Sequence, residues 1–262
     1  MSEHISPYWV EVSPPRHTAE NLTMKLERFS AKYRRAVEAG HAVCLTDNAM
    51  GQCAFQGHEL IETLRLPTGD DQVMIHLNTF HSMADLRWIL DTCVAVGVRR
   101  LLVVSGDGST RLPKLKPSDV GCTTASVTSV ELIAFILRTY PGVFTLGAAF
   151  NQYEPADHEY GKLRRKLDAG AQFIITQPLI QPNPLVDRIC EELSVPVILE
   201  AWMSPKVQLL SDCIGYDLGC AEGYDPMESL RRLRARYQGS SFYLALLDFK
   251  TQFDQLAAGG VA

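Results

Sequence analysis

The sequence lacks the patterns that mark a membrane-spanning, a disulfide-rich or a zinc-binding protein. No apolar run approaches the roughly 18 residues that a transmembrane helix needs, and the first residues, MSEHISPYW, show neither the basic nor the apolar segment of a secretory signal. The seven cysteines form no Cys-x-x-Cys pair and have no histidine at zinc-finger spacing. We therefore expect a soluble, cytoplasmic protein with free thiols, no structural metal and no membrane partner.

The sequence also lacks an excess of positive charge. It has 25 Lys and Arg against 30 Asp and Glu, a formal net charge of -5. The basic residues are scattered except in two helical clusters, at 162–166 and 231–236. Because binding a polyanion needs a positive field, nucleic acid is not expected as a partner.

No Gly/Ser linker or low-complexity tract divides the 262 residues, so a single domain over 1–262 is expected. Short β-branched runs alternate with longer amphipathic ones along the whole chain. The eight expected strands are 8–13, 41–46, 73–78, 100–105, 143–150, 172–177, 195–200 and 241–246. Helical patterns cover 19–38, 83–96, 127–140, 159–169, 185–193, 205–213 and 226–237. Strict alternation of strand and helix in eight units predicts an α/β fold, a closed (β/α)8 TIM barrel.

Several local signals mark where these helices begin and end. Ser82 and Ser204 are expected as N-caps, and Gly40, Gly97 and Gly170 follow helices just before strands. The stretch 106–124 is the longest expected loop and follows the fourth strand.

Polar residues gather at the carboxyl ends of the expected strands, where a barrel of this kind carries its chemistry. Four of them, Glu11, His76, Asp107 and Gln177, interrupt or close runs of large apolar residues, a costly place for an unpaired polar group. The set comprises Glu11 and Ser13, 46–48, His76 and Asn78, 105–107, 150–152, 176–177 and Glu200. It contains no Ser-His-Asp arrangement and no three-ligand metal cluster, and it predicts a mixed pocket of acids, amides and imidazole.

Five collinear motifs resemble the methylenetetrahydrofolate reductase family. They are VEVSPPR at 10–16, VCLTDNA at 43–49, IHLNTF at 75–80, VGVRRLLVVSGD at 96–107 and LRRKLDAGAQFIITQP at 163–178. The resemblance covers about residues 8 to 210 and fades in the last fifty. It implies a TIM barrel that reduces 5,10-methylenetetrahydrofolate to 5-methyltetrahydrofolate in one-carbon metabolism, with NAD(P)H as the hydride donor and FAD as the usual carrier.

The resemblance also implies roles for individual residues. The catalytic residues would be Glu11, as general acid, and Asp107, near the flavin and the pterin. Gln177 and Gln208 would bind the folate. The positions implied for the flavin cofactor are Thr46, His76, Gly106, Phe150, Glu159, Arg165 and Lys166.

Physical arguments support some of these roles and leave alternatives to others. A carboxyl between Trp9, Val10 and Val12 is disfavoured as an anion, so we expect a raised pKa for Glu11, as a general acid needs. The alternative is a rim salt bridge to Arg16. His76 is either a cofactor contact or a hydrogen-bonded core imidazole, and Lys166 is either a phosphate contact or part of a solvated helix face.

The chain departs from the family mainly at flavin positions. Ser105 stands where the family has arginine, Phe150-Asn151-Gln152 and Glu154 replace a Tyr-Pro-Glu and histidine pattern, and Glu159 replaces aspartate. Direct hydride transfer from NAD(P)H without FAD is therefore open, as is a non-redox methyl-transfer or folate-binding protein on the same barrel. A Gly-x-Gly-x-x-Gly fingerprint is absent, which does not discriminate because the family binds nucleotides without one. The oligomeric state is open, since Leu230, Leu233 and Tyr237 pack either on the barrel or on another copy.

Overall fold

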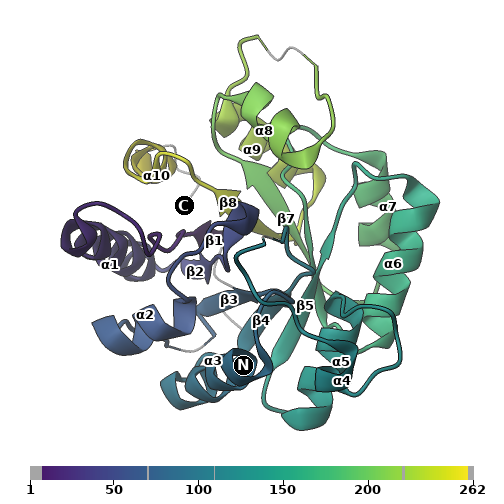
Figure 1. The fold of residues 1–262 in the computed structure, drawn as a ribbon. Coiled ribbons are helices and arrows are strands. Elements are labelled where there is room, and N and C mark those ends of the chain that lie inside the picture. Colours follow the sequence, from purple (N-terminus) through teal and green to yellow (C-terminus); the bar gives the residue numbers. More distant parts are fainter. Residues whose placement is uncertain (1–7, 70, 109, 220–221, 259–262) are drawn as a thin grey trace. The chain divides into compact units, whose positions relative to one another are not determined.

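The computed structural model describes residues 8–69, 71–108, 110–219 and 222–258. Within them, eight parallel strands form a closed barrel in the order β1-β2-β3-β4-β5-β6-β7-β8, and helices follow the strands along the chain (Figure 1). The predicted (β/α)8 fold is confirmed. No described helix combines the length and the apolar character that crossing a bilayer requires.

Most strands are shorter than the sequence pattern suggests, and each begins or ends within a few residues of its expected position. Their bounds are Tyr8–Glu11 (β1), Ala42–Leu45 (β2), Val73–Leu77 (β3), Arg100–Val103 (β4), Thr145–Phe150 (β5), Phe173–Thr176 (β6), Val197–Trp202 (β7) and Ser241–Ala245 (β8). Thr46, Ser105 and Gln177, each expected as the last residue of a strand, thus follow their strands, whereas Glu200 lies within β7.

All the expected helices are present. Two further helices and two short helical turns were not expected. The expected helices are Leu22–Glu38 (α1), Met83–Val96 (α3), Ser129–Thr139 (α5), Ala156–Asp168 (α6), Pro184–Glu192 (α7), Val207–Ile214 (α8) and Pro226–Arg236 (α9). The additional ones are Gly57–Leu64 (α2) and Phe249–Ala258 (α10), with two short turns at Ala49–Gly51 (η1) and Pro117–Val120 (α4). Since α4 lies within the expected loop 106–124, that stretch is not wholly irregular.

Caps explain several of these boundaries. Ser82 accepts a hydrogen bond from the Asp85 backbone N–H and forms a capping box at the start of α3, as predicted. The predicted Ser204 cap is wrong: α8 starts after Lys206, and the Ser204 hydroxyl accepts instead from the Lys206 backbone N–H. The helix therefore begins two residues later than the sequence pattern suggests.

The chain divides into two compact units. Unit 1 comprises Met1–Glu11, Ala149–Leu163 and Phe173–Ala262, and unit 2 comprises Val12–Ala148 and Arg164–Gln172. Each is described by itself below.

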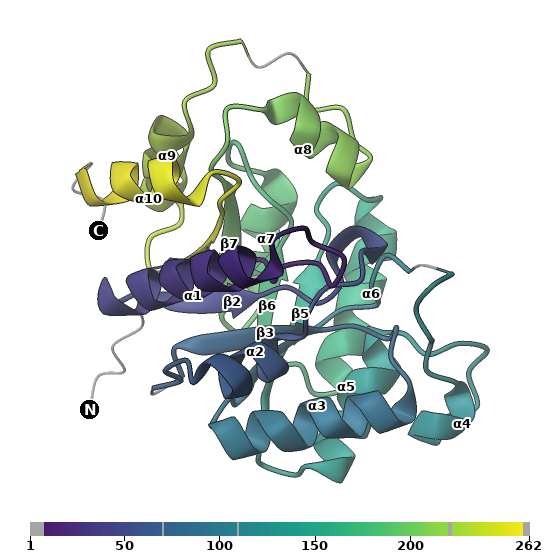
Figure 2. The same cartoon turned by 60° about the vertical axis from the view of Figure 1, so that its left-hand side comes forward.

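In unit 2, β2 pairs with β3, β3 with β4, and β4 with the first part of β5, all in parallel register. Their side chains are almost fully buried, as expected for parallel strands covered by helices. Helices α2 and α3 pack against each other, as Figure 2 shows.

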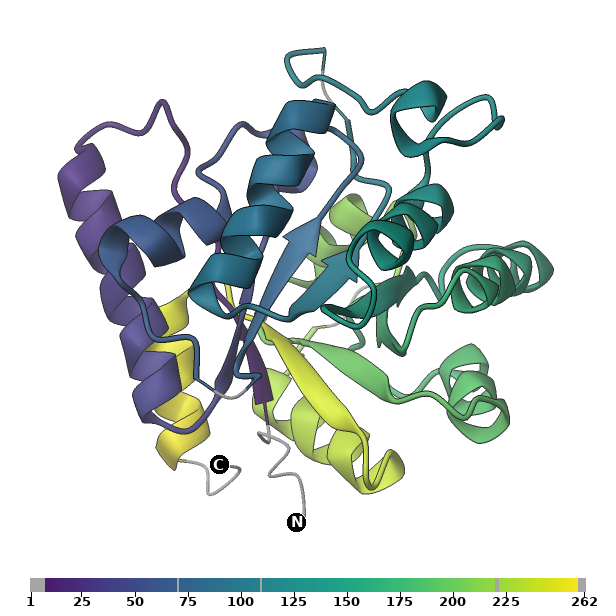
Figure 3. The same cartoon turned by 90° about the horizontal axis from the view of Figure 1, so that it is seen from below.

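In unit 1, β8 pairs with β1 and with β7, and β7 pairs with β6. Figure 3, seen from below, shows β8 in yellow beside β7 in green. The register places Tyr243 of β8 opposite Trp9 of β1 and opposite Glu200 of β7. This row of side chains positions the group of acids described next.

Candidate functional site

The predicted residues of unit 1 include the strand-one acid Glu11, which lies at the end of β1 with its side chain partly exposed. The buried Tyr243 hydroxyl donates a hydrogen bond of 2.9 Å to Glu11 Oε2. Such a donor favours the ionised form of a carboxyl group. Arg16, the alternative partner considered from sequence, has an exposed side chain, and its backbone pairs with Ala54.

A second carboxyl group, Glu200 in β7, lies close enough to Glu11 for their charges to interact. Burial raises the pKa of Glu200 well above its usual range, and the negative field of Glu11 raises it further. The backbone N–H of Glu200 donates to the Thr176 hydroxyl at 3.0 Å, which fixes the strand at this point. Sequence reasoning placed Glu200 among the polar strand ends but gave it no role, because nothing in the local pattern shows that Glu11 lies nearby.

Gln177 follows β6, and its backbone is held by the side chain of Gln152. The Gln152 amide donates to the Gln177 carbonyl at 2.8 Å and accepts from the Gln177 N–H at 3.0 Å. The next residue is also held, since the Tyr153 hydroxyl donates to the Pro178 carbonyl at 2.6 Å. The half-buried Gln177 side chain therefore projects from a backbone that is fixed on both sides.

Gln208, the other predicted folate contact, lies on the exposed face of α8. Its amide donates to Asp212 Oδ1 at 2.9 Å, one helical turn away. A folate contact by Gln208 would have to compete with this weak surface hydrogen bond, which the side chain can break at small cost.

Two of the residues implied for the flavin lie in the interior of unit 1. Phe150 is fully buried. Glu159 is 2% exposed; one carboxylate oxygen accepts from the Asn151 backbone N–H at 3.0 Å, and the other pairs with Lys162 Nζ at 3.2 Å. Lys162 also pairs with Glu154 at 2.6 Å. The carboxylates of Glu154 and Glu159 are therefore both engaged by groups of the protein itself. Phe150 and Glu159 therefore do not fit a direct contact with FAD.

In unit 2, the polar residues after β2 and β3 form a buried network around Asp47. Its carboxylate accepts from the Asn78 backbone N–H at 2.8 Å and lies 2.7 Å from His81 Nε2. The Asn78 amide returns a hydrogen bond of 3.0 Å to the Asp47 carbonyl. Thr46, one residue before, is 8% exposed. Asp47 thus joins the ends of two strands, a role that sequence reasoning did not assign.

His76 projects from β3 with a partly exposed side chain. Burial lowers the pKa of His76 to about 4, although the nearby Asp47 acts in the opposite direction. The imidazole is therefore neutral at physiological pH and can both donate and accept one hydrogen bond.

Gly106 and Asp107 follow β4 and are exposed. The Asp107 carboxylate accepts from the Met50 backbone N–H at 2.8 Å. Gly106 has φ 82°, and a Cβ there would lie 2.9 Å from Asn78 Cβ; Gly108 has φ 73°, and a Cβ there would lie 2.7 Å from Phe80 Cζ. Glycine is required at both positions, for its backbone conformation and for the close approach to the loop after β3.

Arg165 and Lys166 lie in the last turn of α6. Arg165 is exposed and acts electrostatically on Glu131 of α5, and Lys166 is half-buried. Their roles toward a cofactor stay predictions.

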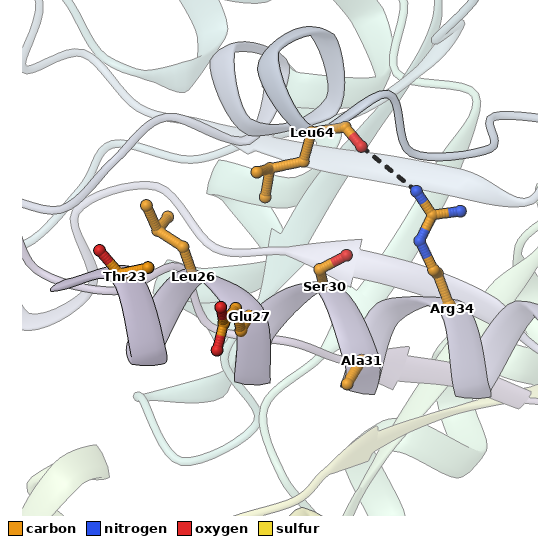
Figure 4. Close-up of a pocket in the computed structure, with 7 residues that line it drawn as sticks. All are labelled: Thr23, Leu26, Glu27, Ser30, Ala31, Arg34 and Leu64. Carbon is orange, nitrogen blue, oxygen red and sulfur yellow. Dashed lines mark hydrogen bonds between the residues drawn. The ribbon is translucent and has the colours of Figure 1, made fainter. Parts of the chain in front are cut away.

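A groove of about 530 Å³ lies on the outside of unit 2, between α1 and α2 (Figure 4). Arg34 crosses it and donates to the Leu64 carbonyl at 3.2 Å. Its lining residues are Thr23, Leu26, Glu27, Ser30, Ala31, Arg34 and Leu64, none of which was predicted to act in the site. Among the described residues, no group of three or more His, Cys, Asp and Glu side chains is placed to hold a metal ion.

The family model of methylenetetrahydrofolate reductase matches residues 3–197, about three quarters of the 262 residues. The chain belongs to this family. Its membership agrees with the resemblance of the five motifs, and the matched segment contains Glu11, Asp107 and Gln177. A search of curated proteins finds no match.

Solved structures share the fold of this family member at low sequence identity. An uncharacterized protein from Clostridium thermocellum that binds two copies of 5-methyl-5,6,7,8-tetrahydrofolic acid has a TM-score of 0.61 at 11% identity, covering 96% of this chain and 92% of that one. A deoxyribose-phosphate aldolase described as putative, from Toxoplasma gondii ME49, has a TM-score of 0.53 at 12% identity, covering 97% and 94%. Oxaloacetate acetylhydrolase has a TM-score of 0.54 at 12% identity, covering 97% and 80%. At these identities the likeness concerns the fold.

Proposed function

We propose that this protein reduces 5,10-methylenetetrahydrofolate to 5-methyltetrahydrofolate with a hydride from NAD(P)H. Family membership supports the reaction class. The structural neighbour from Clostridium thermocellum supports a folate ligand, because the molecule it binds is the product of this reaction. The observation that carries the proposal is the acid Glu11, held by Tyr243 at the end of β1 and coupled to a second carboxyl group.

The chemistry needs a proton before it needs a hydride. The methylene carbon bridges N5 and N10 of the folate, and protonation of N10 makes that nitrogen a leaving group. The carbon–N10 bond then breaks with its electron pair going to N10, and the N5 iminium ion forms. Hydride addition to the iminium carbon gives the methyl group. Glu11 supplies the proton, a role for which a carboxyl group in a partly buried, negatively charged setting is suited.

The other predicted residues bind and orient the folate in this proposal. Gln177 offers both a donor and an acceptor to the pterin edge from a fixed backbone. Gln208 is exposed and available to the substrate after giving up one hydrogen bond, and the family role of Asp107 stays a prediction.

We write the hydride transfer as direct, from NAD(P)H to the folate, because Glu159 and Phe150 do not fit a contact with FAD. The visible absorption spectrum of protein purified without added cofactor tests this part. We expect no absorption bands at wavelengths longer than those of the protein's aromatic residues. The bands of an oxidised flavin would contradict direct transfer and restore FAD, with Thr46, His76, Gly106, Arg165 and Lys166 as its contacts.

The test of the reaction itself is product formation. Purified protein with 5,10-methylenetetrahydrofolate and NADH or NADPH should yield 5-methyltetrahydrofolate in a one-to-one ratio with the oxidised nucleotide, measured by chromatography and by absorbance. If the protein binds tetrahydrofolate but never oxidises either nucleotide, the runner-up function holds instead, a non-redox methyl-transfer or folate-binding protein. One observation favours that alternative: Glu154 and Glu159 pair with Lys162, which argues against a bound flavin.

A further inference from the structure

Trp202, the last residue of β7, carries a buried hydrogen-bond donor. The residue is 5% exposed, and its indole Nε1 makes no hydrogen bond to any part of the chain that the structure describes. Because an unpaired buried donor costs free energy, nearly all such groups in proteins are satisfied by the protein, by water or by a ligand. At the carboxyl end of a barrel strand, where these folds carry their chemistry, an unpaired donor points to an acceptor on a bound molecule.

The backbone of Trp202 is tied to the segment that carries Gln177. This segment continues from β6 along β7: the Leu179 N–H donates to the Glu200 carbonyl at 2.7 Å, and the Trp202 N–H donates to the Leu179 carbonyl at 3.1 Å. Leu179 thereby forms a parallel bridge with Ala201. Trp202 therefore lies beside the residues that directly follow Gln177, the residue for which the family implies a folate contact.

The side chain of Trp202 packs against α8, the helix that carries Gln208. Trp202 forms a buried apolar cluster with Leu210 of α8 and with Ala245 at the end of β8, and Ile214 of α8 packs against this cluster. Helix α8 lies in the connection between β7 and α9, at the carboxyl end of β7. Trp202 thus contacts both segments that carry a glutamine implied to bind the folate.

Trp202 also shares a face of the sheet with the residues around Glu11. Residues two apart on one strand point to the same face, as do neighbours in register on parallel strands. Trp202 is two residues beyond Glu200, which lies opposite Tyr243, and the Tyr243 hydroxyl donates to Glu11 at 2.9 Å. The Trp202 side chain therefore projects from the same face as Tyr243, one layer of side chains nearer the carboxyl ends of the strands.

The surroundings of the indole limit the kind of acceptor that it can meet. The neighbouring side chains of Leu210, Ile214 and Ala245 are apolar, so an ionised carboxylate placed among them would be costly. The carboxylates of the folate's glutamate tail are therefore unsuited. The pterin suits the position, because it is a flat ring system with neutral acceptors, a ring carbonyl and ring nitrogens.

We propose that the Trp202 indole N–H donates a hydrogen bond to the pterin ring of the folate, so that Trp202 is a substrate-binding residue of this site. The inference rests on the proposed function for the identity of the ligand. The pterin gains a hydrogen bond here without breaking one inside the protein, since the donor has no partner among the described residues. Gln208, by contrast, first has to give up its bond to Asp212.

NMR spectroscopy of the indole N–H groups tests this contact without relying on turnover. The chain has three tryptophans, Trp9, Trp88 and Trp202, so protein labelled with 15N-tryptophan gives signals that single Trp→Phe replacements assign. Adding 5-methyltetrahydrofolate should move the Trp202 proton signal downfield, and the signal of the exposed Trp88 should stay in place. p-Aminobenzoylglutamate, which has the tail but no pterin, should move neither.

Trp202→Phe keeps an aromatic ring and removes the donor. The Kd for 5-methyltetrahydrofolate, measured by calorimetry, should rise by about threefold to tenfold, the effect of one neutral hydrogen bond. Trp88→Phe is the matched control, since Trp88 is 48% exposed on α3, and should leave the Kd unchanged.

Two results would overturn the inference: a Trp202 signal that stays in place when the protein is saturated with 5-methyltetrahydrofolate, or one that moves equally with p-aminobenzoylglutamate. In the first case Trp202 only packs the apolar cluster, even if the protein turns over. A protein whose Trp202 signal moves with the folate but which never oxidises NAD(P)H would overturn the proposed reduction alone.

Discussion

The hydroxyl of Tyr243 donates a hydrogen bond of 2.9 Å to Glu11 Oε2, joining the first and last strands of the barrel across 232 residues of sequence. Tyr243 is 1% exposed, so its ring is fixed by packing. The bond therefore holds Glu11 in one place.

Tyr243→Phe keeps the ring and removes the donor. We expect kcat for methylenetetrahydrofolate reduction to fall by about tenfold or more, because Glu11 loses its orientation, and the free energy of unfolding to fall by about 1 kcal/mol. Steady-state kinetics and urea denaturation measure the two effects. Tyr33→Phe is the matched control: its buried hydroxyl donates to the Pro67 carbonyl at 2.6 Å, so stability should fall similarly with kcat unchanged. Equal loss of activity in both variants would mean that the Tyr243 bond matters only for folding.

Gly108 is predicted to tolerate no side chain. In Gly108→Ala, the new Cβ would meet the Phe80 ring at 2.7 Å, and the residue would also keep φ 73°. Gly142→Ala is the control, since it has φ 71° and nothing within 4 Å of the new Cβ. Thermal unfolding should show a loss of about 1 kcal/mol in Gly142→Ala, from strain alone, and about 1 to 3 kcal/mol more in Gly108→Ala. Equal losses of stability in the two variants would show that the loop carrying Gly108 can move away from Phe80 at no cost.

Asp47 is expected to stabilise the ends of β2 and β3. Its side chain is 1% exposed and accepts hydrogen bonds from the Asn78 backbone and from His81. Asp47→Asn removes the charge that strengthens both bonds, so the free energy of unfolding should fall by about 2 kcal/mol. Asp85→Asn, at the exposed start of α3, should cost less than about 1 kcal/mol. Chemical denaturation compares them, and an equal or larger loss in Asp85→Asn would refute the structural role of Asp47.

His58 should make the protein sensitive to acid. It is fully buried, packs edge-on against Trp88, and neither ring nitrogen has a hydrogen-bond partner among the described residues. Burial and then the neighbouring His81 lower the pKa of His58 to about 4, against the opposing effect of Asp47. Because the folded state binds this proton more weakly than the unfolded state does, stability is constant above about pH 6.5 and falls as pH drops from there to about 4.

The size of this effect is on the order of 3 kcal/mol for a shift from about 6.5 to about 4. His58→Leu removes the titrating group and leaves no hydrogen bond broken. The free energy of unfolding, measured between pH 7 and pH 4.5, should therefore fall less steeply in the variant than in the wild type. His158→Leu, whose side chain is 61% exposed, should leave the slope unchanged. If the free energy of unfolding fell with pH as steeply in His58→Leu as in the wild type, His58 would not be the group responsible.

The barrel was predictable from sequence because each of its signals is local. The β-branched runs, the amphipathic runs and caps such as Ser82 act over a few residues, and the structure confirms them within a few positions. Helix α2 was not predicted because it is short and begins at Gly57, and glycine usually disfavours a helix. Glycine is needed at this position, since a Cβ there would lie 3.0 Å from Leu45 Cβ. Helix α10 was not predicted because its sequence mixes apolar and polar residues with only a weak helical period.

The site was predictable only in part. Glu11 could be singled out because an acid inside an apolar strand is costly and therefore informative. Its partners could not, since Tyr243 and Glu200 lie more than 180 residues away and only the pairing of β1, β8 and β7 brings them near. The same applies to Asp47, whose hydrogen bonds to Asn78 and His81 span 31 and 34 residues. The roles of Lys166 and Arg165, the cytoplasmic location and the number of subunits stay predictions.

The most direct test of the proposed function is a comparison of wild type with Glu11→Gln in the reduction of 5,10-methylenetetrahydrofolate by NAD(P)H, with folate binding measured in parallel by calorimetry. The amide keeps the size of the side chain but cannot supply a proton. We predict turnover in the wild type, a loss of about a hundredfold or more in kcat for Glu11→Gln with folate affinity retained, and no change for the exposed control Glu228→Gln. A Glu11→Gln variant that turns over as fast as the wild type, or a wild type that binds folate without oxidising NAD(P)H, would contradict the account.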